Sequence, residues 1–355
     1  MGILSRYIGK TIFSATLLSL FVLMGLSAII KFVEQMGNIG SGTYNVIDAL
    51  SFVLLKMPYE LATFFPMAAL IGVLIGLGTL ASSNELVVMQ AAGMSKFKIA
   101  AFVLKTAIPM ILVVMLITEF IAPSADKKAY SLRDEARYGE ASVSNKYGQR
   151  VKDGNDYISI GRINSNSKLF DIRMYLFDDK MILHSALFAR KGIFKGDHWA
   201  LTNISETLFL GDKTKVINQD EYDWKTTLTP AKLEVILTDP AKMSMRDIYS
   251  YIKYLHHNAQ DASSYWLTLW RKCFLPFTVA VMMLLSVSFI FSGLRTVSMG
   301  TRLIFGIASG FLFHVSGKLF GPFSLVFRLP PILGALLPSI LVLIVAIYLL
   351  RKQSG

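Results

Sequence analysis

Residues 61–100 read LATFFPMAALIGVLIGLGTLASSNELVVMQAAGMSKFKIA. The first part, residues 61–81, contains no Asp, Glu, Lys or Arg. It is long enough to cross a bilayer as a helix, which takes about 20 apolar residues. Residues 82–100 are too polar to cross the bilayer, yet they carry more apolar side chains than a simple solvated loop needs. Residues 61–100 therefore combine a membrane span with a short amphipathic segment, which indicates a membrane protein.

Further apolar runs of similar length make the whole chain a membrane protein. Of its 355 residues, 53% are hydrophobic and 17% charged, whereas a soluble domain carries about 25% charged residues. The first run follows Arg6 and Lys10, as in a signal peptide, but its length and the lack of a small-residue cleavage site favour a retained anchor. The six predicted spans are Ile12–Val33, Leu61–Ala81, Ala101–Ala122, Cys273–Gly293, Leu303–Phe320 and Pro331–Leu350.

The Lys and Arg residues near the span ends predict the orientation, because cytoplasmic loops are enriched in them. One set of ends holds Arg6, Lys10, Lys96, Lys98, Arg295, Arg302, Arg351 and Lys352. The opposite ends hold fewer, namely Lys31, Lys56, Lys318 and Arg328. We therefore expect both termini and residues 81–100 in the cytoplasm, with the long segment 123–272 on the far side.

The segment 123–272 separates two groups of three predicted spans, 1–122 and 273–355. It opens with a helix that continues the third span to Gly139. From 143 to 237 the hydrophobic period switches to two. The strand-like segments are DYISIGRI, LFDIRMYLF, MILHSALFARKGIF, HWALTNISETLFL and YDWKTTL, with turns at Asp153-Gly154, Asp178-Asp179 and Gly196-Asp197. This spacing predicts an all-β sandwich, jelly roll or barrel. A helix with Met245, Ile248, Ile252 and Leu255 on one face then leads back to the membrane.

Residue patterns for catalysis and for cofactors are absent from the sequence. There is no G-x-x-x-x-G-K-[ST] for ATP, and the five His residues show no metal-ligand spacing. The net charge of +12 is scattered along the chain, which disfavours nucleic acid as a partner. The single cysteine, Cys273, excludes an intramolecular disulfide. We expect no enzyme activity and no cofactor in this chain.

The amphipathic segment predicts a short helix over residues 83–92. Ser82-x-x-Glu85 matches a capping box, Gly93 fits a helix stop, and Ser95 can cap the next helix. Such a helix either packs on the membrane surface or its own bundle, or it docks in a groove of a cytoplasmic partner. In the second interpretation the contacts are Glu85, Leu86, Val87 and Met89.

Basic residues near the far membrane boundary have two interpretations. Lys31 and Lys318 lie near span ends, and Arg133 lies on the helix outside the third span. They either extend to lipid head groups or converge on an anionic ligand. Gly72 and Gly76 form a G-x-x-x-G pattern, which predicts close approach of two helices.

Six segments resemble the lipopolysaccharide export permeases of the LptF/LptG family. They are RYIGKTIF (6–13), IIKFVEQ (29–35), FFPMAALIG (64–72), ELVVMQAAG (85–93), VAVMMLLSVSFIF (279–291) and PPILGALLP (330–338). They occur in the family's order, and the resemblance extends over nearly the whole chain. The segment 143–237 matches in position and length more than in residues.

The resemblance implies a subunit of an ABC exporter in the inner membrane of Gram-negative bacteria, with a periplasmic β-jellyroll. Its expected partners are an LptF-like paralogous permease, an LptB-like ATPase dimer that binds the ATP, and an LptC-like single-helix protein. The expected substrate is lipopolysaccharide, which leaves the inner membrane for a periplasmic bridge towards the outer membrane.

The resemblance also implies residue roles. Residues 83–92 match the coupling helix, in which Glu85 pairs with a basic residue of the ATPase. Lys31 and Arg133 match residues that face lipid phosphates, and Phe64 matches one that lines the cavity. Lys318 is a further candidate by position, because Gly37-Asn38 stand where the family often has basic residues. The alternative is a membrane-anchored periplasmic binding or scaffold protein without a transport cycle.

Overall fold

A computed structural model describes most of the chain. The described residues are 2–138, 142–153, 156–164, 168–178, 181–211, 213–226, 228–230, 233, 239–257, 260–291 and 298–351. Several residues used in the sequence predictions lie outside them: Gly139, Gly154, Asp179, Gly293, Arg295 and Lys352.

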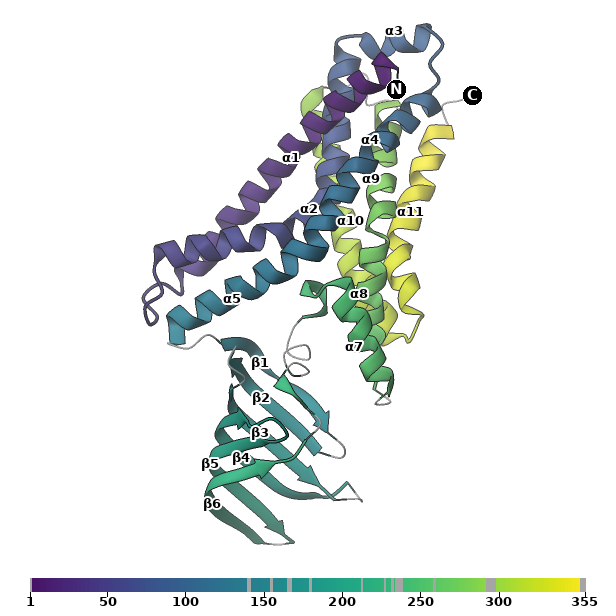
Figure 1. Cartoon of the computed structure of the whole chain (residues 1–355). Coiled ribbons are helices and arrows are strands. Elements are labelled where there is room, and N and C mark those ends of the chain that lie inside the picture. Colours follow the sequence, from purple (N-terminus) through teal and green to yellow (C-terminus); the bar gives the residue numbers. More distant parts are fainter. Residues whose placement is uncertain are drawn as a thin grey trace. The chain divides into compact units, whose positions relative to one another are not determined.

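The chain divides into two compact units (Figure 1). The first comprises Met1–Lys31, Lys56–Ser124 and Pro240–Gly355, and the second comprises Phe32–Leu55 and Ala125–Asp239. This division differs from the predicted domain 123–272 at both ends of that segment. The return helices after residue 239 belong with the membrane helices, whereas the loop after the first span belongs with the β strands.

Helices make up the first unit and parts of the second. They are α1 (Ile3–Met36), α2 (Val46–Ser82), α3 (Glu85–Ala91), α4 (Lys96–Leu116), the π-helix η1 (Ile117–Ile121), α5 (Ala122–Tyr138), the 3-10 helix η2 (Pro240–Lys242), α7 (Met245–His257), α8 (Ser263–Cys273), α9 (Leu275–Phe291), α10 (Met299–Val326) and α11 (Pro331–Arg351). Within the described residues, five helices are apolar and long enough to cross a membrane, or six if a bent pair is one span. Five of the six predicted spans thus match helices of this kind, and the predicted fourth span, Cys273–Gly293, falls on the bent pair.

The bent pair is α8 and α9, whose axes differ by 52°. Pro276 is the second residue of α9, where its ring fits a first helical turn but would interrupt a helix running through. The predicted fourth span therefore corresponds to α9, and α8 is an additional helix that the sequence analysis did not identify. α7 was predicted, and its side chains Ile248, Ile252 and Leu255 are buried.

In the first unit, α2 is the central helix. Of its apolar window 72% is buried, compared with 28% for α1 and 11% for α10. Gly76 lies so close to α1 that an added Cβ would stand 3.2 Å from Ile12 Cα, and one at Gly72 would overlap the backbone of Thr16. The close approach that the G-x-x-x-G pattern predicts is therefore present.

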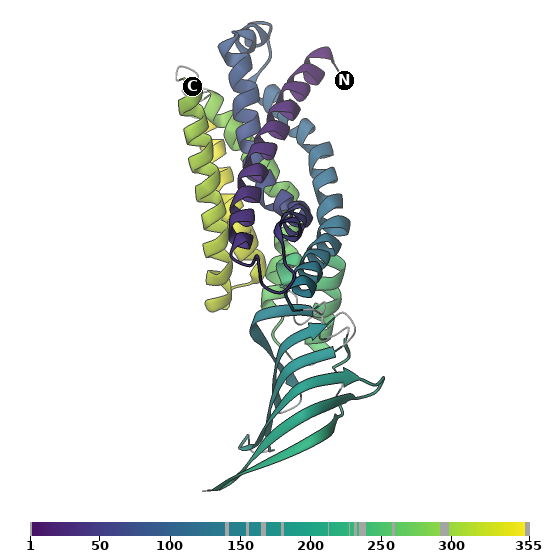
Figure 2. The same cartoon turned by 90° about the vertical axis from the view of Figure 1, so that its left-hand side faces the viewer.

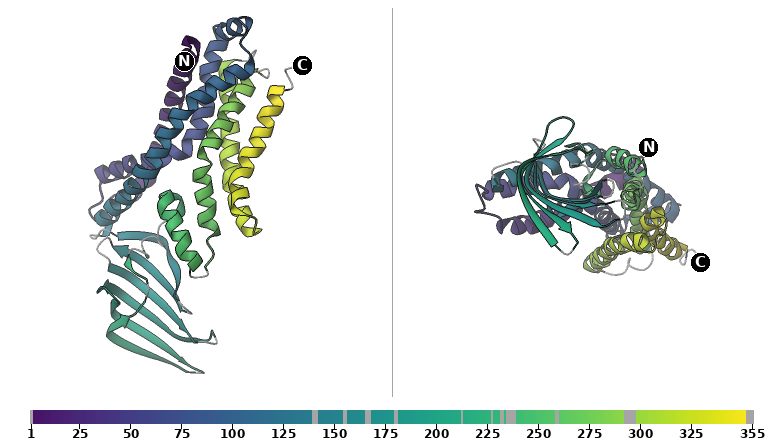
Figure 3. Two further views of the ribbon diagram at one scale, coloured as in Figure 1. Left: turned by 45° about the vertical axis from the view of Figure 1, so that its right-hand side comes forward. Right: turned by 90° about the horizontal axis from the view of Figure 1, so that it is seen from below.

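In the second unit, six described strands form one antiparallel sheet in the order of the sequence (Figure 2). They are β1 (Ser142–Asp153), β2 (Asp156–Asn164), β3 (Lys168–Phe177), β4 (Leu183–Phe194), β5 (Trp199–Leu210) and β6 (Lys213–Trp224). The sheet is curved, as the view along the vertical axis in Figure 3 shows. The all-β insertion is confirmed, and each strand pairs with its neighbours in sequence.

One aromatic cluster closes the buried face of the sheet. Trp199 is fully buried, and its indole N–H donates to the carbonyl of Leu228 at 2.7 Å. Its ring centroid lies 5.1 Å from that of Phe194 and 6.5 Å from that of Trp224. Trp199 and Trp224 are also partners in the β5–β6 register. The tryptophan thus fixes both the last strand and the chain that follows it.

Candidate functional site

The segment between α2 and α4 forms a helix, but not by the predicted capping box. Ser82 is the last residue of α2, and its hydroxyl donates to Thr79 of the same helix. α3 begins at Glu85 after Asn84, which is left-handed with φ 61° and makes no side-chain cap. The Ser83 hydroxyl instead donates to the Glu85 carboxylate at 2.9 Å. The predicted start at Ser83 was therefore wrong by two residues, because Ser82 continues α2. The predicted cap at Ser95 is present.

α3 presents a different face outwards from the one predicted. Leu86 and Met89 are 1% and 7% exposed and belong to the core of the helical unit. They pack on the chain's own bundle, which is the first of the two interpretations. Val88 is 66% exposed, and Val87 and Glu85 are partly exposed. The outward surface of α3 therefore includes Glu85, Val87 and Val88, together with Gln90 and Ala91.

Lys31 on α1 is held by a carboxylate on α2. Its ammonium lies 3.1 Å from Glu60 Oε1, and the Ser27 hydroxyl donates to Glu60 Oε2 at 3.3 Å. Glu60 is 7% exposed, whereas the Lys31 side chain is 25% exposed. The pair therefore joins the two helices and leaves Lys31 within reach of solvent.

Arg133 on α5 has a carboxylate and two aromatic rings around its guanidinium. It donates from Nε and from an η nitrogen to Asp134 Oδ1, at 3.1 and 3.0 Å. The guanidinium lies 5.2 Å from the Phe52 ring centroid and 4.8 Å from that of Tyr130. Asp134 is fully buried, so this arrangement stabilises the junction of α2 and α5 inside the second unit.

The remaining predicted residues are Phe64 and Lys318. Phe64 on α2 is half-buried and packs against the core of the first unit. Lys318 on α10 is exposed. The structure places Lys31, Phe64 and Lys318 in the same unit, and none of the three is among the residues that line the cavity described next.

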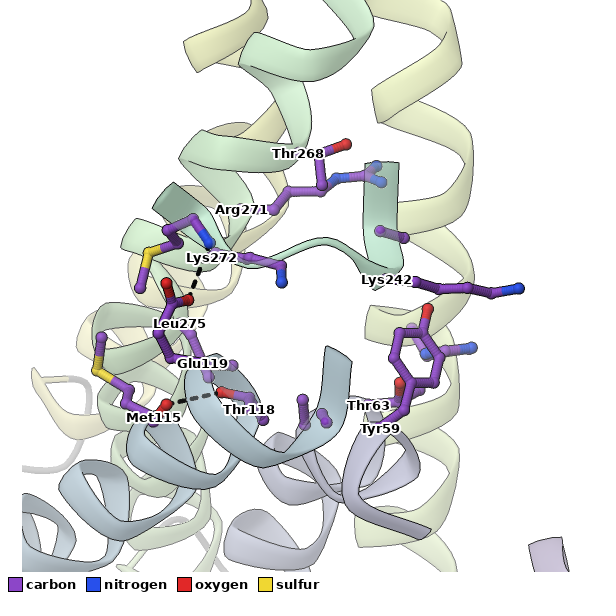
Figure 4. Close-up of a pocket in the computed structure, with 15 residues that line it drawn as sticks. Tyr59, Thr63, Met115, Thr118, Glu119, Lys242, Thr268, Arg271, Lys272 and Leu275 are labelled. Carbon is purple, nitrogen blue, oxygen red and sulfur yellow. Dashed lines mark hydrogen bonds between the residues drawn. The ribbon is translucent and has the colours of Figure 1, made fainter. Parts of the chain in front are cut away.

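A cavity of about 310 Å³ lies among several helices of the first unit (Figure 4). Its basic lining residues are Lys242 of η2, Arg271 and Lys272 of α8, and His314 of α10. Figure 4 shows Lys272 and Glu119 on one side of the cavity, with Lys242, Tyr59 and Thr63 on the other. The other lining residues are Ala62, Met115, Thr118, Ala122, Ala241, Met245, Thr268 and Leu275.

Glu119 ties the edge of this cavity to α7. It lies in the π-helix η1, which turns its carboxylate towards the first residues of α7. Its oxygens accept hydrogen bonds from the backbone N–H groups of Met245 at 2.9 Å and Arg246 at 3.4 Å. A negative charge at a helix N-terminus is stabilised by the unpaired N–H groups there. Isolated π-turns of this kind are frequent at functional sites.

The same helix start carries a side-chain cap at Ser244 that the sequence analysis missed. Ser244 Oγ accepts from the Asp247 N–H at 3.1 Å and donates to the Asp247 carboxylate at 2.7 Å. The pattern Ser-x-x-Asp is visible in the sequence. The cavity itself carries no such signal, since its lining comes from segments far apart in the chain.

The full length of the chain matches known proteins. The family described as lipopolysaccharide export system permease LptF/LptG matches residues 6–352. The Lipopolysaccharide export system permease protein LptG of Escherichia coli K12 is 43% identical over 99% of both chains. The LptG protein of Haemophilus influenzae KW20 Rd is 42% identical, over 99% of this chain and 98% of its own length.

Proposed function

The chain belongs to the LptF/LptG family of lipopolysaccharide export system permeases, and from this membership we propose how its parts serve export. It is a transmembrane subunit of a lipopolysaccharide transporter and a multi-pass protein of the inner membrane. The alternative of a scaffold without a transport cycle gains no support. The relatives that match 99% of this chain are named as permease proteins. The coupling, the partners and the orientation are the proposal.

α3 is the element through which a separate ATPase drives the transport cycle. The carrying observation is its surface: a short helix between α2 and α4 exposes Val88 and, in part, Glu85. Leu86 and Met89 anchor it to the bundle, so movement of α3 is transmitted to both neighbouring helices. An exposed apolar side chain beside a carboxylate suits a groove with an apolar floor and a basic rim.

The partners follow from the same reasoning. The ATPase is an LptB-like dimer, and a dimer presents two grooves, so a second permease of LptF type fills the other. An LptC-like single helix packs against the apolar outer surface of the bundle, where α1 and α10 are little buried. α3 and both termini are cytoplasmic, and the β unit is periplasmic.

Lys31, Arg133, Phe64 and Lys318 serve the substrate in this proposal. Phosphate groups carry up to about two negative charges near neutral pH. A phosphate therefore competes with Glu60 for Lys31, because Lys31 keeps part of its side chain exposed. Phe64 contacts the acyl chains, and Arg133 and Lys318 each supply a further positive charge for lipid phosphates.

Co-purification of the ATPase with variants of α3 tests the coupling. We expect Val88→Asp and Glu85→Lys each to weaken ATPase capture and to abolish lipopolysaccharide release from proteoliposomes. A charge-assisted hydrogen bond contributes about 1.5–3 kcal/mol. Ile3→Asp is the matched control, because Ile3 is 90% exposed and lies at the start of α1, off α3. Wild-type capture and release by both α3 variants would remove the coupling role.

A further inference from the structure

We propose that the cavity lined by Lys242, Arg271 and Lys272 binds the phosphate of a membrane lipid head group, at a site separate from Lys31. The proposal rests on the proposed function only for the assignment of a membrane to the helices. The ligand chemistry is a phosphate attached to acyl chains, which a glycerophospholipid or the exported lipid can supply.

The cavity lies at head-group depth. Three of its lining residues, Ala62, Ala122 and Lys272, fall within one residue of the predicted span ends Leu61, Ala122 and Cys273. All three are span ends that the Lys and Arg pattern predicts on the non-cytoplasmic side of the membrane. These residues of α2, α5 and α8 thus place this cavity where hydrocarbon meets head groups on that side of the membrane.

The charge of the lining favours an anion. Lys242, Arg271 and Lys272 supply three positive charges, and Glu119 supplies the single carboxylate in the lining. The carboxylate of Asp247, outside the lining, already accepts a hydrogen bond from the Ser244 hydroxyl. The Glu119 oxygens already accept from two backbone amides of α7. Basic pockets between membrane helices are typical binding sites for anionic head groups.

The contacts of the two α8 cations leave donors for a ligand. Lys272 Nζ donates to the carbonyl of Met243, and one η nitrogen of Arg271 donates to that of Gly317. A carbonyl accepts a hydrogen bond without neutralising the charge. A lysine has three N–H donors and an arginine has five, so each keeps the capacity to bind phosphate oxygens.

The remaining lining fits the rest of a lipid. Tyr59 and Thr63 lie on the side of Lys242, across from Lys272, and their hydroxyls can donate to phosphate or ester oxygens (Figure 4). Ala62, Met115 and Leu275 provide an apolar wall for the start of an acyl chain. A volume of about 310 Å³ is at the lower end of the usual range of about 300–1,000 Å³ for such sites.

Photocrosslinking from position 63 tests the proposal. The full chain, with its co-purified partners, carries a benzophenone amino acid in place of Thr63 and is held in dodecyl maltoside micelles. Phosphatidylglycerol, lipopolysaccharide or phosphate-free diacylglycerol is added at equal mole fraction, and the attached lipid is identified by mass spectrometry. We expect diacylglycerol to label about tenfold less than a phosphate-bearing lipid, a factor that corresponds to about 1.4 kcal/mol.

Charge variants complete the test. Lys242→Gln and Lys272→Gln should each lower labelling several-fold, whereas Lys272→Arg should retain it. Lys253→Gln on α7 is the matched control, since Lys253 is exposed and does not line the cavity. Arg271 is left unchanged because its contact with Gly317 also packs α8 on α10.

The outcomes show which lipid supplies the phosphate, and they distinguish the cavity proposal from the coupling proposal. Labelling by phosphatidylglycerol assigns the site to a resident lipid, and labelling by lipopolysaccharide alone assigns it to the substrate; both support a phosphate site. Equal labelling by diacylglycerol, or wild-type labelling in both Gln variants, overturns it. ATPase capture through α3 is measured on the same preparation, so a failure of the cavity proposal is distinguishable from a failure of the coupling.

Discussion

The ammonium of Lys31 lies 3.1 Å from Glu60 Oε1 and thereby joins α1 to α2 across the first unit. Ser27 adds a second contact from α1 to the same carboxylate. A basic side chain that binds a substrate phosphate must therefore exchange one anionic partner for another. Loss of the ion pair would also loosen the contact between the two helices.

A charge swap separates the two roles of Lys31. Lys31→Glu alone places two carboxylates together and should lower stability by about 1–2 kcal/mol, less than for a fully buried pair because Lys31 is partly exposed. Lys31→Glu with Glu60→Lys should recover the melting temperature of the purified chain. If Lys31 contacts phosphate, the swapped protein should still show reduced lipopolysaccharide crosslinking from position 64. Full recovery of crosslinking would mean that only the ion pair matters.

The severity of single substitutions gives a second test of Lys31. Lys31→Asp, and Arg133→Glu less severely, should reduce crosslinking from position 64 and export while the assembled complex is retained. Lys31→Ala should be milder, because it removes attraction without adding repulsion. Co-purification of the partners checks assembly. If Lys31→Asp leaves crosslinking unchanged in a complete complex, Lys31 is an anchor between helices and not a phosphate ligand.

The contact of Gly72 with Thr16 predicts a stability loss on enlarging the glycine. A Cβ at position 72 overlaps the Thr16 backbone, and overpacking of this kind costs about 1–3 kcal/mol. Gly72→Ala should therefore lower the melting temperature in detergent. Gly25→Ala on α1 is the matched control, since nothing lies within 4 Å of a Cβ there. It should be neutral or stabilising, because alanine is the better helix former.

The spans were predictable because a bilayer demands long apolar runs, whatever the tertiary structure. The ends of the helices were not. α1 starts at Ile3 and α2 at Val46, well outside the predicted spans, because the helices continue beyond the apolar part. The pattern Ser82-x-x-Glu85 predicted a helix start, but Ser82 is the last residue of α2. Its hydroxyl donates to the carbonyl of Thr79 in that helix and so cannot cap α3.

The positions of the strands were also only partly predictable from the sequence. The alternating segments became β2 to β5, whose inward side chains include Ile160, Leu169 and Leu201. The last strand was expected over 222–228, but β6 runs from Lys213 to Trp224. Most of its side chains are exposed because it lies at the edge of the sheet. An edge strand with few buried residues lacks the period of two on which the prediction depends.

The basic cavity could not be predicted, since its lining converges only in the folded unit. Lys242, Arg271 and His314 are far apart in the sequence and carry no shared motif. In the sequence, Glu119 is a lone carboxylate within the predicted span Ala101–Ala122. Its role depends on the π-turn at Ile117–Ile121, which propensity does not reveal.

Orientation is testable by cysteine labelling in a Cys273→Ala background. Asp156→Cys should react with a membrane-impermeant thiol reagent added to the periplasm, whereas Lys96→Cys should react only after the inner membrane is opened. The reason is the excess of Lys and Arg at the ends that include residues 96 and 98. The reverse pattern would place α3 outside the cytoplasm and exclude its coupling to an ATPase.

We expect Glu119 to stabilise the first turn of α7. Glu119→Ala removes the acceptors for Met245 and Arg246, and loss of a helix cap costs about 0.5–2 kcal/mol. The hydrogen bond from the Asp247 N–H to the Ser244 hydroxyl remains, so α7 should stay folded while its first amides exchange hydrogen faster. Hydrogen exchange of the peptide 245–257 measures this. Glu119→Gln should fall between wild type and alanine because one acceptor oxygen is kept, and Glu135→Ala on the exposed face of α5 should change nothing. Unaltered exchange in Glu119→Ala would show that the Ser244 cap alone stabilises the start of α7 and that Glu119 does not contribute.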